Sequence, residues 1–252
     1  MRVAILNCDF AKRYLEQYGD FADMAITMLE KTRGQCEMTD FTVYQVHKNE
    51  FPTLDILREF SGIYITGSES DSFDNSTPWI IRLRQLVAEL LKNEDYPPIA
   101  GVCFGHQIVA SSLGCKVARN VKGFEGGIVD LQLTSDAVNA GLFQRSPDSP
   151  TKNLKIVEVH HDIVYEVPQG YTNVGSSSKC SIQGLYKKNR LFTLQGHPEF
   201  VTEVSSRILD NMYQCNHLTS KERNDLEASS QKQDNQGYFA ATYIWKLFCQ
   251  DI

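Results

Sequence analysis

Two short segments of the chain hold residues with the types and spacing of a nucleophilic site. The first is Gly101-Val102-Cys103-Phe104-Gly105-His106-Gln107, which lies between the apolar residues 99–102 and the apolar segment 108–113. A nucleophile on a sharp strand-to-helix turn needs a strained backbone, and small residues two positions before and after it keep that turn free of clashes. The free N–H groups and the dipole of the following helix favour a thiolate. We therefore interpret Cys103 as a reactive cysteine, with a small buried apolar residue as the alternative.

The second segment supplies a base for such a thiol. It is Gln195-Gly196-His197-Pro198-Glu199, and it follows the apolar residues 191–194. Residues i and i+2 of an extended backbone face the same side, and a proline favours extended geometry in the residue before it. Glu199 can then contact the far ring nitrogen of His197, fix its tautomer and stabilise the imidazolium when His197 takes the thiol proton. Without Cys103, the same segment is typical of an ordinary polar turn.

Together, the two segments resemble the class I glutamine amidotransferases, the Cys-His-Glu amidase domains of which GMP synthetase carries one. The strand pattern agrees with this family over about residues 1–215. The resemblance implies that Cys103 attacks the γ-carbonyl of a γ-glutamyl group, that His197 is the base and later the acid, and that Glu199 orients His197. It also implies a γ-glutamyl thioester that water hydrolyses.

The resemblance implies roles for four supporting residues as well. The oxyanion hole would combine the backbone N–H of Phe104 with a backbone N–H at Gly67-Ser68, the turn after the third strand. Gln107 would help to hold the α-amino and α-carboxylate end of the substrate. The plainer interpretations are that Gly67 only ends a strand and that Gln107 is a polar residue in the first turn of a helix.

A third polar segment, His160-His161-Asp162, lies where many members of the family have Ser-His-Gly-Asp beside the glutamine pocket. In this match the second histidine and the aspartate correspond and the intervening glycine is missing, so a substrate contact by Asp162 is a hypothesis. Adjacent histidines also raise the question of a metal. Neighbouring strand residues point to opposite faces, however, and no third ligand stands at a familiar spacing, so we predict no metal site.

The identity of the leaving group and of any partner stays open at this point. The chain has no glycine-rich phosphate loop, we expect no cofactor, and the roughly 50 residues after Glu199 are too few for a synthase domain. It therefore either lends ammonia to a separate synthase subunit or acts alone. Gly196 stands where biosynthetic members commonly have phenylalanine, and it is similar to the glycine of stand-alone relatives, including plant γ-glutamyl peptidases that cleave glutathione conjugates. Glutamine and glutathione both present a γ-glutamyl amide.

Three functional hypotheses follow from these segments. The first is a cysteine amidase that acts on γ-glutamyl amides, either as a glutamine amidotransferase or as a γ-glutamyl peptidase. The second is a hydrolase of the α/β-hydrolase type, which predicts an acidic residue between nucleophile and histidine, whereas Glu199 follows His197. The third is a catalytically silent relative with a regulatory role, which the complete set of Cys103, His197 and Glu199 argues against.

The elements that must position these residues alternate between strands and helices. Over the first half we predict strands at 2–8, 41–46, 62–67 and 99–102 and helices at 21–30, 54–60, 78–91 and 108–113. The second half is richer in strands, predicted at 116–119, 128–133, 154–159, 172–175, 181–186 and 190–195, and ends with helices at 201–213 and 237–248. This pattern predicts an α/β fold, a three-layer α/β/α sandwich with a mainly parallel central sheet and the site at the carboxyl ends of its strands.

Composition limits the remaining classes. The 252 residues suit a single domain, with a core of about residues 1–215 and a helical extension of about 216–252 that we expect to pack on the edge of the sheet. The net charge of −6 and the lack of a basic cluster argue against a nucleic-acid partner. No long apolar run predicts a membrane span, and the seven cysteines lack a Cys-x-x-Cys pair, so we expect a cytoplasmic protein with reduced thiols.

Overall fold

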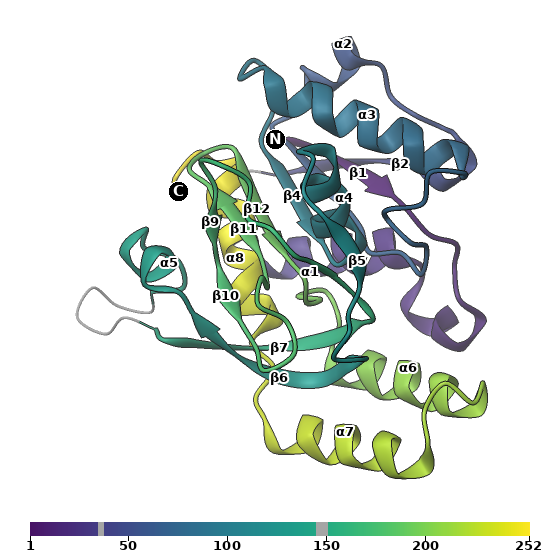
Figure 1. Cartoon of the computed structure of the whole chain (residues 1–252). Coiled ribbons are helices and arrows are strands. Elements are labelled where there is room, and N and C mark those ends of the chain that lie inside the picture. Colours follow the sequence, from purple (N-terminus) through teal and green to yellow (C-terminus); the bar gives the residue numbers. More distant parts are fainter. Residues whose placement is uncertain (35–37, 145–150) are drawn as a thin grey trace.

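A seven-stranded sheet forms the centre of the molecule (Figure 1). The computed structural model describes residues 1–34, 38–144 and 151–252, so Cys36 lies outside the described residues. The strand order is β2-β1-β3-β4-β12-β11-β9. These strands are β1 (Arg2–Asn7), β2 (Asp40–Gln45), β3 (Gly62–Ile65), β4 (Ile99–Val102), β9 (Thr172–Asn173), β11 (Leu185–Lys187) and β12 (Leu191–Leu194).

The first five strands in this order run parallel, and the last two pair antiparallel. Strands β3, β4 and β12 are buried throughout because helices cover both faces of the sheet. The helices of the first half are α1 (Phe21–Thr32), α2 (Leu54–Leu57), α3 (Pro78–Lys92) and α4 (Phe104–Ser112), and two short 3-10 turns are η1 (Arg13–Tyr18) and η2 (Val46–Lys48).

Apolar side chains divide the core into two layers, one on each face of this sheet. On one face, helices α1 and α8 (Gly237–Phe248) share an apolar cluster with the strands, and the Trp245 indole N–H donates to the Leu29 carbonyl at 2.9 Å. On the other face, α3 and α4 pack on the strands through residues such as Leu83 and Ile108. The predicted three-layer sandwich with a mainly parallel sheet is confirmed.

A second, antiparallel sheet continues the chain beside the first. It contains β10 (Gly175–Ser176), β6 (Glu125–Leu133) and β7 (Asn153–His160), and β5 (Val117–Arg119) pairs with β8 (Asp162–Val164) next to it. Helices α6 (Thr202–Gln214) and α7 (Ser220–Lys232) lie along this sheet, at the bottom of Figure 1, and α5 (Ser135–Asn139) is a short helix. No helix in the described part of the chain is long and apolar enough to cross a bilayer.

Five details of the sequence prediction were wrong. Helix α8 covers a face of the sheet rather than its edge, because eight of its residues are buried. Helix α4 begins at Phe104, earlier than its apolar periodicity. The segment 172–175 is divided between two sheets, and only the end of 181–186 is a strand. Helix α7 was not predicted because it is polar on nearly all sides, although the capping box of Thr219 and Glu222 marks its start.

Candidate active site

Cys103 occupies the sharp turn between β4 and α4. Its φ of 48° lies in the left-handed region, which a residue other than glycine seldom adopts, and it is the N-cap of α4. The flanking glycines are required by close packing. A Cβ on Gly101 would lie 2.9 Å from the carbonyl carbon of Gly105, and a Cβ on Gly105 would overlap the carbonyl oxygen of Ile65. The strained turn expected for a nucleophile is therefore present.

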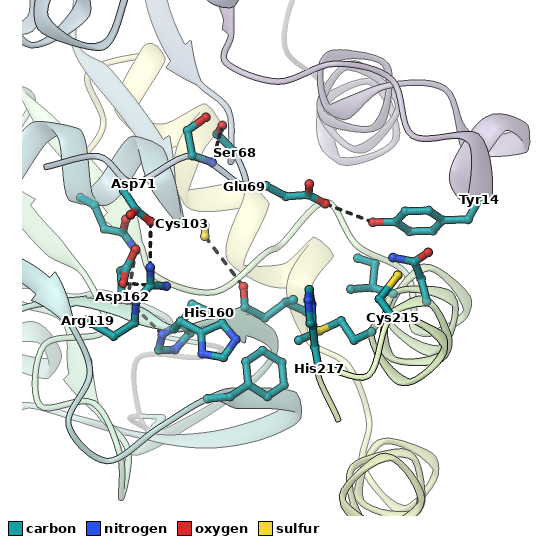
Figure 2. A pocket seen from close by; sticks show the side chains of 18 residues that line it. Tyr14, Ser68, Glu69, Asp71, Cys103, Arg119, His160, Asp162, Cys215 and His217 are labelled. Atoms are coloured by element: carbon teal, nitrogen blue, oxygen red, sulfur yellow. Dashed lines mark hydrogen bonds and ion pairs between the residues drawn. The ribbon is translucent and has the colours of Figure 1, made fainter. Parts of the chain in front are cut away.

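The Cys103 thiol is turned toward the second sheet. The residue is 7% exposed, and its Sγ lies 4.0 Å from the carbonyl oxygen of Val159 on β7 (Figure 2). At this corner the N–H groups of Phe104, Gly105 and His106 precede the first i to i−4 hydrogen bond of α4, in which the Gln107 N–H donates to the Cys103 carbonyl at 3.0 Å. The thiol is thus nearly buried beside the N-terminal N–H groups of α4.

His197 connects Cys103 to Glu199. The His197 Nδ1 and the Glu199 Oε1 are 2.8 Å apart, both side chains are buried, and the ring stacks on Phe200 with 4.0 Å between the ring centres. Cys103 lies close enough to the ring for its charge to act on the imidazole. Burial acts to lower the pKa of His197, but the charges of Glu199 and Cys103 outweigh it and raise the pKa to about 10. This environment stabilises the positively charged form of the His197 ring beside Cys103.

The backbone predicted to form the oxyanion hole surrounds the same thiol. A Cβ on Gly67 would lie 2.9 Å from the His197 Cε1 and 3.7 Å from the Cys103 Cβ, so the turn after β3 is in direct contact with both residues. Ser68 lines the cavity beside Cys103, and Phe104 is the first residue of α4. The structure therefore places both predicted backbone segments beside Cys103.

The family model for class I glutamine amidotransferases matches residues 20–215. The chain belongs to this family. A Saccharomyces cerevisiae protein with the provisional name glutamine amidotransferase is 46% identical over 257 residues, which cover all of this chain and 98% of the relative. Gamma-glutamyl peptidase 2 of Arabidopsis thaliana is 30% identical over 200 residues, 79% of this chain and 75% of the peptidase. A Thermotoga maritima glutamine amidotransferase structure has a TM-score of 0.69 and 21% identity, covers 98% of this chain and 96% of its own, and shows the same fold.

In this amidotransferase fold, a cavity of about 470 Å³ opens over Cys103. Figure 2 shows Cys103 between two different ends of the cavity. One end carries Asp71, Arg119 and Asp162, and the other carries Cys215 and His217. Among the described residues that line the cavity, Arg119 is the only lysine or arginine.

The charged end of the cavity is a network of one arginine and two aspartates. Arg119 lies 3.1 Å from the Asp71 carboxylate and 3.2 Å from the Asp162 carboxylate. Burial raises the pKa of Asp162 to about 6, with the Arg119 charge acting against this rise and Asp71 adding to it. The predicted residue Gln107 is buried nearby and donates from Nε2 to the Asp162 carbonyl at 3.1 Å. Asp162 and Gln107 therefore meet at the same wall of the cavity, and the sequence analysis had missed Arg119.

The two adjacent histidines of the third polar segment lie in different surroundings. His161 stacks on Phe124 at 4.8 Å and is half-buried, whereas His160 is buried and lies 3.1 Å from Glu125 and 3.3 Å from Glu158. Ligand atoms of these three residues lie within 4.8 Å of one another, the spacing of a metal site. The i and i+2 spacing of Glu158 and His160, the same spacing used for His197 and Glu199, was the signal that could have paired them.

Proposed function

We propose that this chain is a cysteine amidase that hydrolyses γ-glutamyl amide bonds through a thioester on Cys103. The observation that carries the proposal is the grouping of Cys103, His197 and Glu199. The His197 Nδ1 lies 2.8 Å from Glu199, the Gly67 turn lies next to both Cys103 and His197, and the cavity over Cys103 holds an arginine and two aspartates. A strained nucleophile, a buried histidine and an orienting carboxylate are the parts that acyl transfer needs.

The reaction proceeds in two halves. The Cys103 thiolate attacks the γ-carbonyl carbon, and the N–H groups of Phe104 and of the Gly67-Ser68 turn stabilise the oxyanion. The His197 imidazolium gives its proton to the leaving nitrogen, the C–N bond breaks, and a γ-glutamyl thioester remains. His197, now neutral, takes a proton from water, whose oxygen attacks the thioester, and glutamate leaves as the thiolate and imidazolium re-form.

The charged end of the cavity suits the head of a γ-glutamyl substrate. This head carries an α-carboxylate and an α-ammonium whatever the leaving group is. The Arg119 guanidinium pairs with the carboxylate, and Asp162 and Asp71 attract the ammonium. Gln107 supports this wall through its hydrogen bond to the Asp162 carbonyl. Because the cavity continues past Cys103 toward Cys215 and His217, it favours leaving groups larger than ammonia, such as those of γ-glutamyl peptides.

Removal of the Arg119 charge is expected to raise KM for γ-glutamyl substrates about tenfold with kcat within about twofold, since a hydrogen bond to a charged group contributes about 1.5–3 kcal/mol and solvent exposure reduces it. Arg119→Gln tests this, and Arg2→Gln, which breaks an exposed ion pair with Glu59, is the matched control.

KM for γ-glutamyl substrates is also expected to rise as pH falls through about 6, because protonated Asp162 no longer attracts the ammonium. If KM of the Asp162→Asn variant still rises as pH falls through about 6, the pH dependence belongs to another group.

The deciding experiment is glutamate release by the purified chain from glutamine, glutathione and a γ-glutamyl dipeptide, with Cys103→Ala as the blank. We expect hydrolysis of glutathione or the dipeptide without any partner, which identifies a γ-glutamyl peptidase. Activity on glutamine only, or only after a cell extract is added, identifies an amidotransferase that works with a separate synthase subunit. No glutamate from any substrate under either condition would overturn the proposal in favour of a catalytically silent relative.

A further inference from the structure

Behind the proposed catalytic pair lies a buried ionic cluster of Glu125, Glu158 and His160. The carboxylate of Glu125 on β6 lies 3.1 Å from the His160 Nε2 and also accepts from Ser177 at 2.7 Å and from Gln183 at 2.9 Å. Glu158 lies 3.3 Å from the same His160 nitrogen. None of the three residues is more than 4% exposed. This cluster is not used by the chemistry described above.

Both ring nitrogens of His160 face acceptors. Nε2 faces the two carboxylates, and Nδ1 lies 3.1 Å from the Asp162 carbonyl oxygen. A histidine with an acceptor at each nitrogen is satisfied only when both nitrogens carry a proton. Burial acts to lower the pKa of His160, but the neighbouring carboxylates of Glu125 and Glu158 raise it to about 10. A proton on Nε2 therefore takes the place that a metal ion would need.

Glu158 is the unusual member of the cluster. It is fully buried, and neither of its carboxylate oxygens has a hydrogen-bond partner among the described residues. Burial raises its pKa, and the positive charges of His160 and His197 act in the opposite direction. Its carboxylate therefore interacts with the charges of two histidine rings, one of which belongs to the proposed catalytic site.

Because Gly196 has no side chain, the Glu158 carboxylate can pack directly against its backbone. A Cβ on Gly196 would lie 2.5 Å from the Glu158 Oε1 and 2.9 Å from the Ile156 Cγ2. The space beside the residue that precedes His197 is thus filled by a carboxylate from β7, and any larger side chain at position 196 would displace it. Gly196 and Glu158 fit each other as a pair.

The same stretch of β7 contacts both reacting residues through its backbone. The Val157 carbonyl accepts the His197 backbone N–H at 2.8 Å, and the Val159 carbonyl faces the Cys103 Sγ at 4.0 Å. Carbonyls of residues i and i+2 point to the same edge of a strand, and the side chains of Glu158 and His160, also two residues apart, share one face of β7. The ionic cluster therefore fixes the strand whose carbonyls contact the nucleophile and the base.

We propose that Glu158 is a positioning residue for the Cys103–His197 pair, acting through the ionic cluster and through its charge on His197, and that Gly196 is the residue that admits it. The proposal rests on the proposed function only in taking Cys103 and His197 as the reacting pair. Within residues 1–34, 38–144 and 151–252, the ionisable groups whose charges act on His197 are Glu199 from its own turn, Cys103 from the start of α4, and Glu158 from β7.

The first test measures the reactivity of Cys103 without any substrate. The rate of its alkylation by iodoacetamide is followed against pH by mass spectrometry of the Cys103 peptide in the wild-type chain and in Glu158→Gln. Because the variant loses a negative charge that stabilises the imidazolium, we expect alkylation to slow about five- to tenfold near pH 6 and less than twofold near pH 9. Glu59→Gln removes the same charge from an exposed ion pair and is the matched control.

A Glu158→Gln chain that folds and keeps the wild-type alkylation profile would overturn the proposal. So would one equivalent of tightly bound metal in the purified wild-type chain that Glu158→Gln abolishes, because the cluster would then be a metal site. If the wild-type and Glu158→Gln alkylation profiles are the same and the wild-type chain releases no glutamate, both this proposal and the proposed function are wrong. If the profiles differ but the wild-type chain releases no glutamate, this proposal alone is supported.

The second test couples the glycine to the carboxylate. Gly196→Ala is expected to lower the alkylation rate of Cys103 about tenfold near pH 6, and to lower it by less than about threefold in a chain that already carries Glu158→Ala. If Gly196→Ala prevents folding at room temperature, the thermal unfolding midpoints are compared instead, and the loss caused by Gly196→Ala is expected to shrink in the Glu158→Ala background. The pairing would be contradicted if the double variant's loss of alkylation rate equals the product of the two single losses. It would also be contradicted if the change in its unfolding midpoint equals the sum of the two single changes.

Discussion

Replacement of Cys103 by serine is expected to lower kcat for glutamate release by about 10⁴-fold or more while leaving the fold intact. A serine hydroxyl is a far weaker nucleophile than a thiolate, and residues of a catalytic triad act as a unit, so loss of one removes most of the rate. The structural change is small, because the side chain keeps its shape and its Sγ has only a weak contact with the Val159 carbonyl at 4.0 Å. Turnover and thermal unfolding measured on the same preparation check both parts.

The matched control for this substitution is Cys115→Ser. Cys115 follows α4, is half-buried and does not line the cavity, so its loss is expected to leave turnover within about twofold. A second readout is the intermediate itself: acid-quenched wild-type protein should carry a γ-glutamyl group on the Cys103 peptide. Substantial turnover by a folded Cys103→Ser or Cys103→Ala chain would exclude the thioester mechanism.

Replacement of His197 has the second largest expected effect, a loss of about 10³- to 10⁴-fold in kcat/KM. His197→Ala removes the group that gives a proton to the leaving nitrogen, and it also leaves the buried Glu199 carboxylate without its partner, which costs about 1–3 kcal/mol of stability. His197→Gln is therefore the better variant, because its amide can still donate to Glu199. Both variants are compared by steady-state kinetics and by chemical unfolding.

The pH dependence of the wild-type chain gives an independent check on His197. Its pKa is raised to about 10, so the imidazolium is retained through neutral pH. We expect kcat/KM to fall as pH rises through about 10, where the imidazolium loses its proton, and the residual activity of His197→Gln should lack this limb.

Glu199→Gln provides the graded comparison for His197. Its amide can still contact the Nδ1 of His197, so a milder loss of about 10- to 100-fold is expected, mainly because the charge that stabilises the imidazolium is gone. A rate unchanged within error would remove Glu199 from the triad. Activity of His197→Gln within tenfold of wild type would show that another residue acts as the base.

Local sequence signals were sufficient for the elements and for the turn that carries the nucleophile. Alternating apolar runs and amphipathic helices predicted the parallel sheet, and the glycines on either side of Cys103 marked the strained turn that the φ of 48° shows. These signals are local because periodicity and turn chemistry act over a few residues. The assignment of 1–252 to a single domain and the catalytic roles of the site residues stay predictions.

Contacts between segments far apart in the chain were beyond the reach of such signals. The sequence shows Glu125, Glu158, His160 and Gly196 only as scattered residues, and the register of β6 with β7 together with the approach of the 195–197 segment brings them together. Likewise, Arg119 becomes part of the cavity because β5 pairs with β8, which places it opposite Asp162. Spacing and local geometry were therefore enough to predict a nucleophile, a base and an orienting carboxylate. The charged residues around them depend on strand pairing, which is a property of the whole fold.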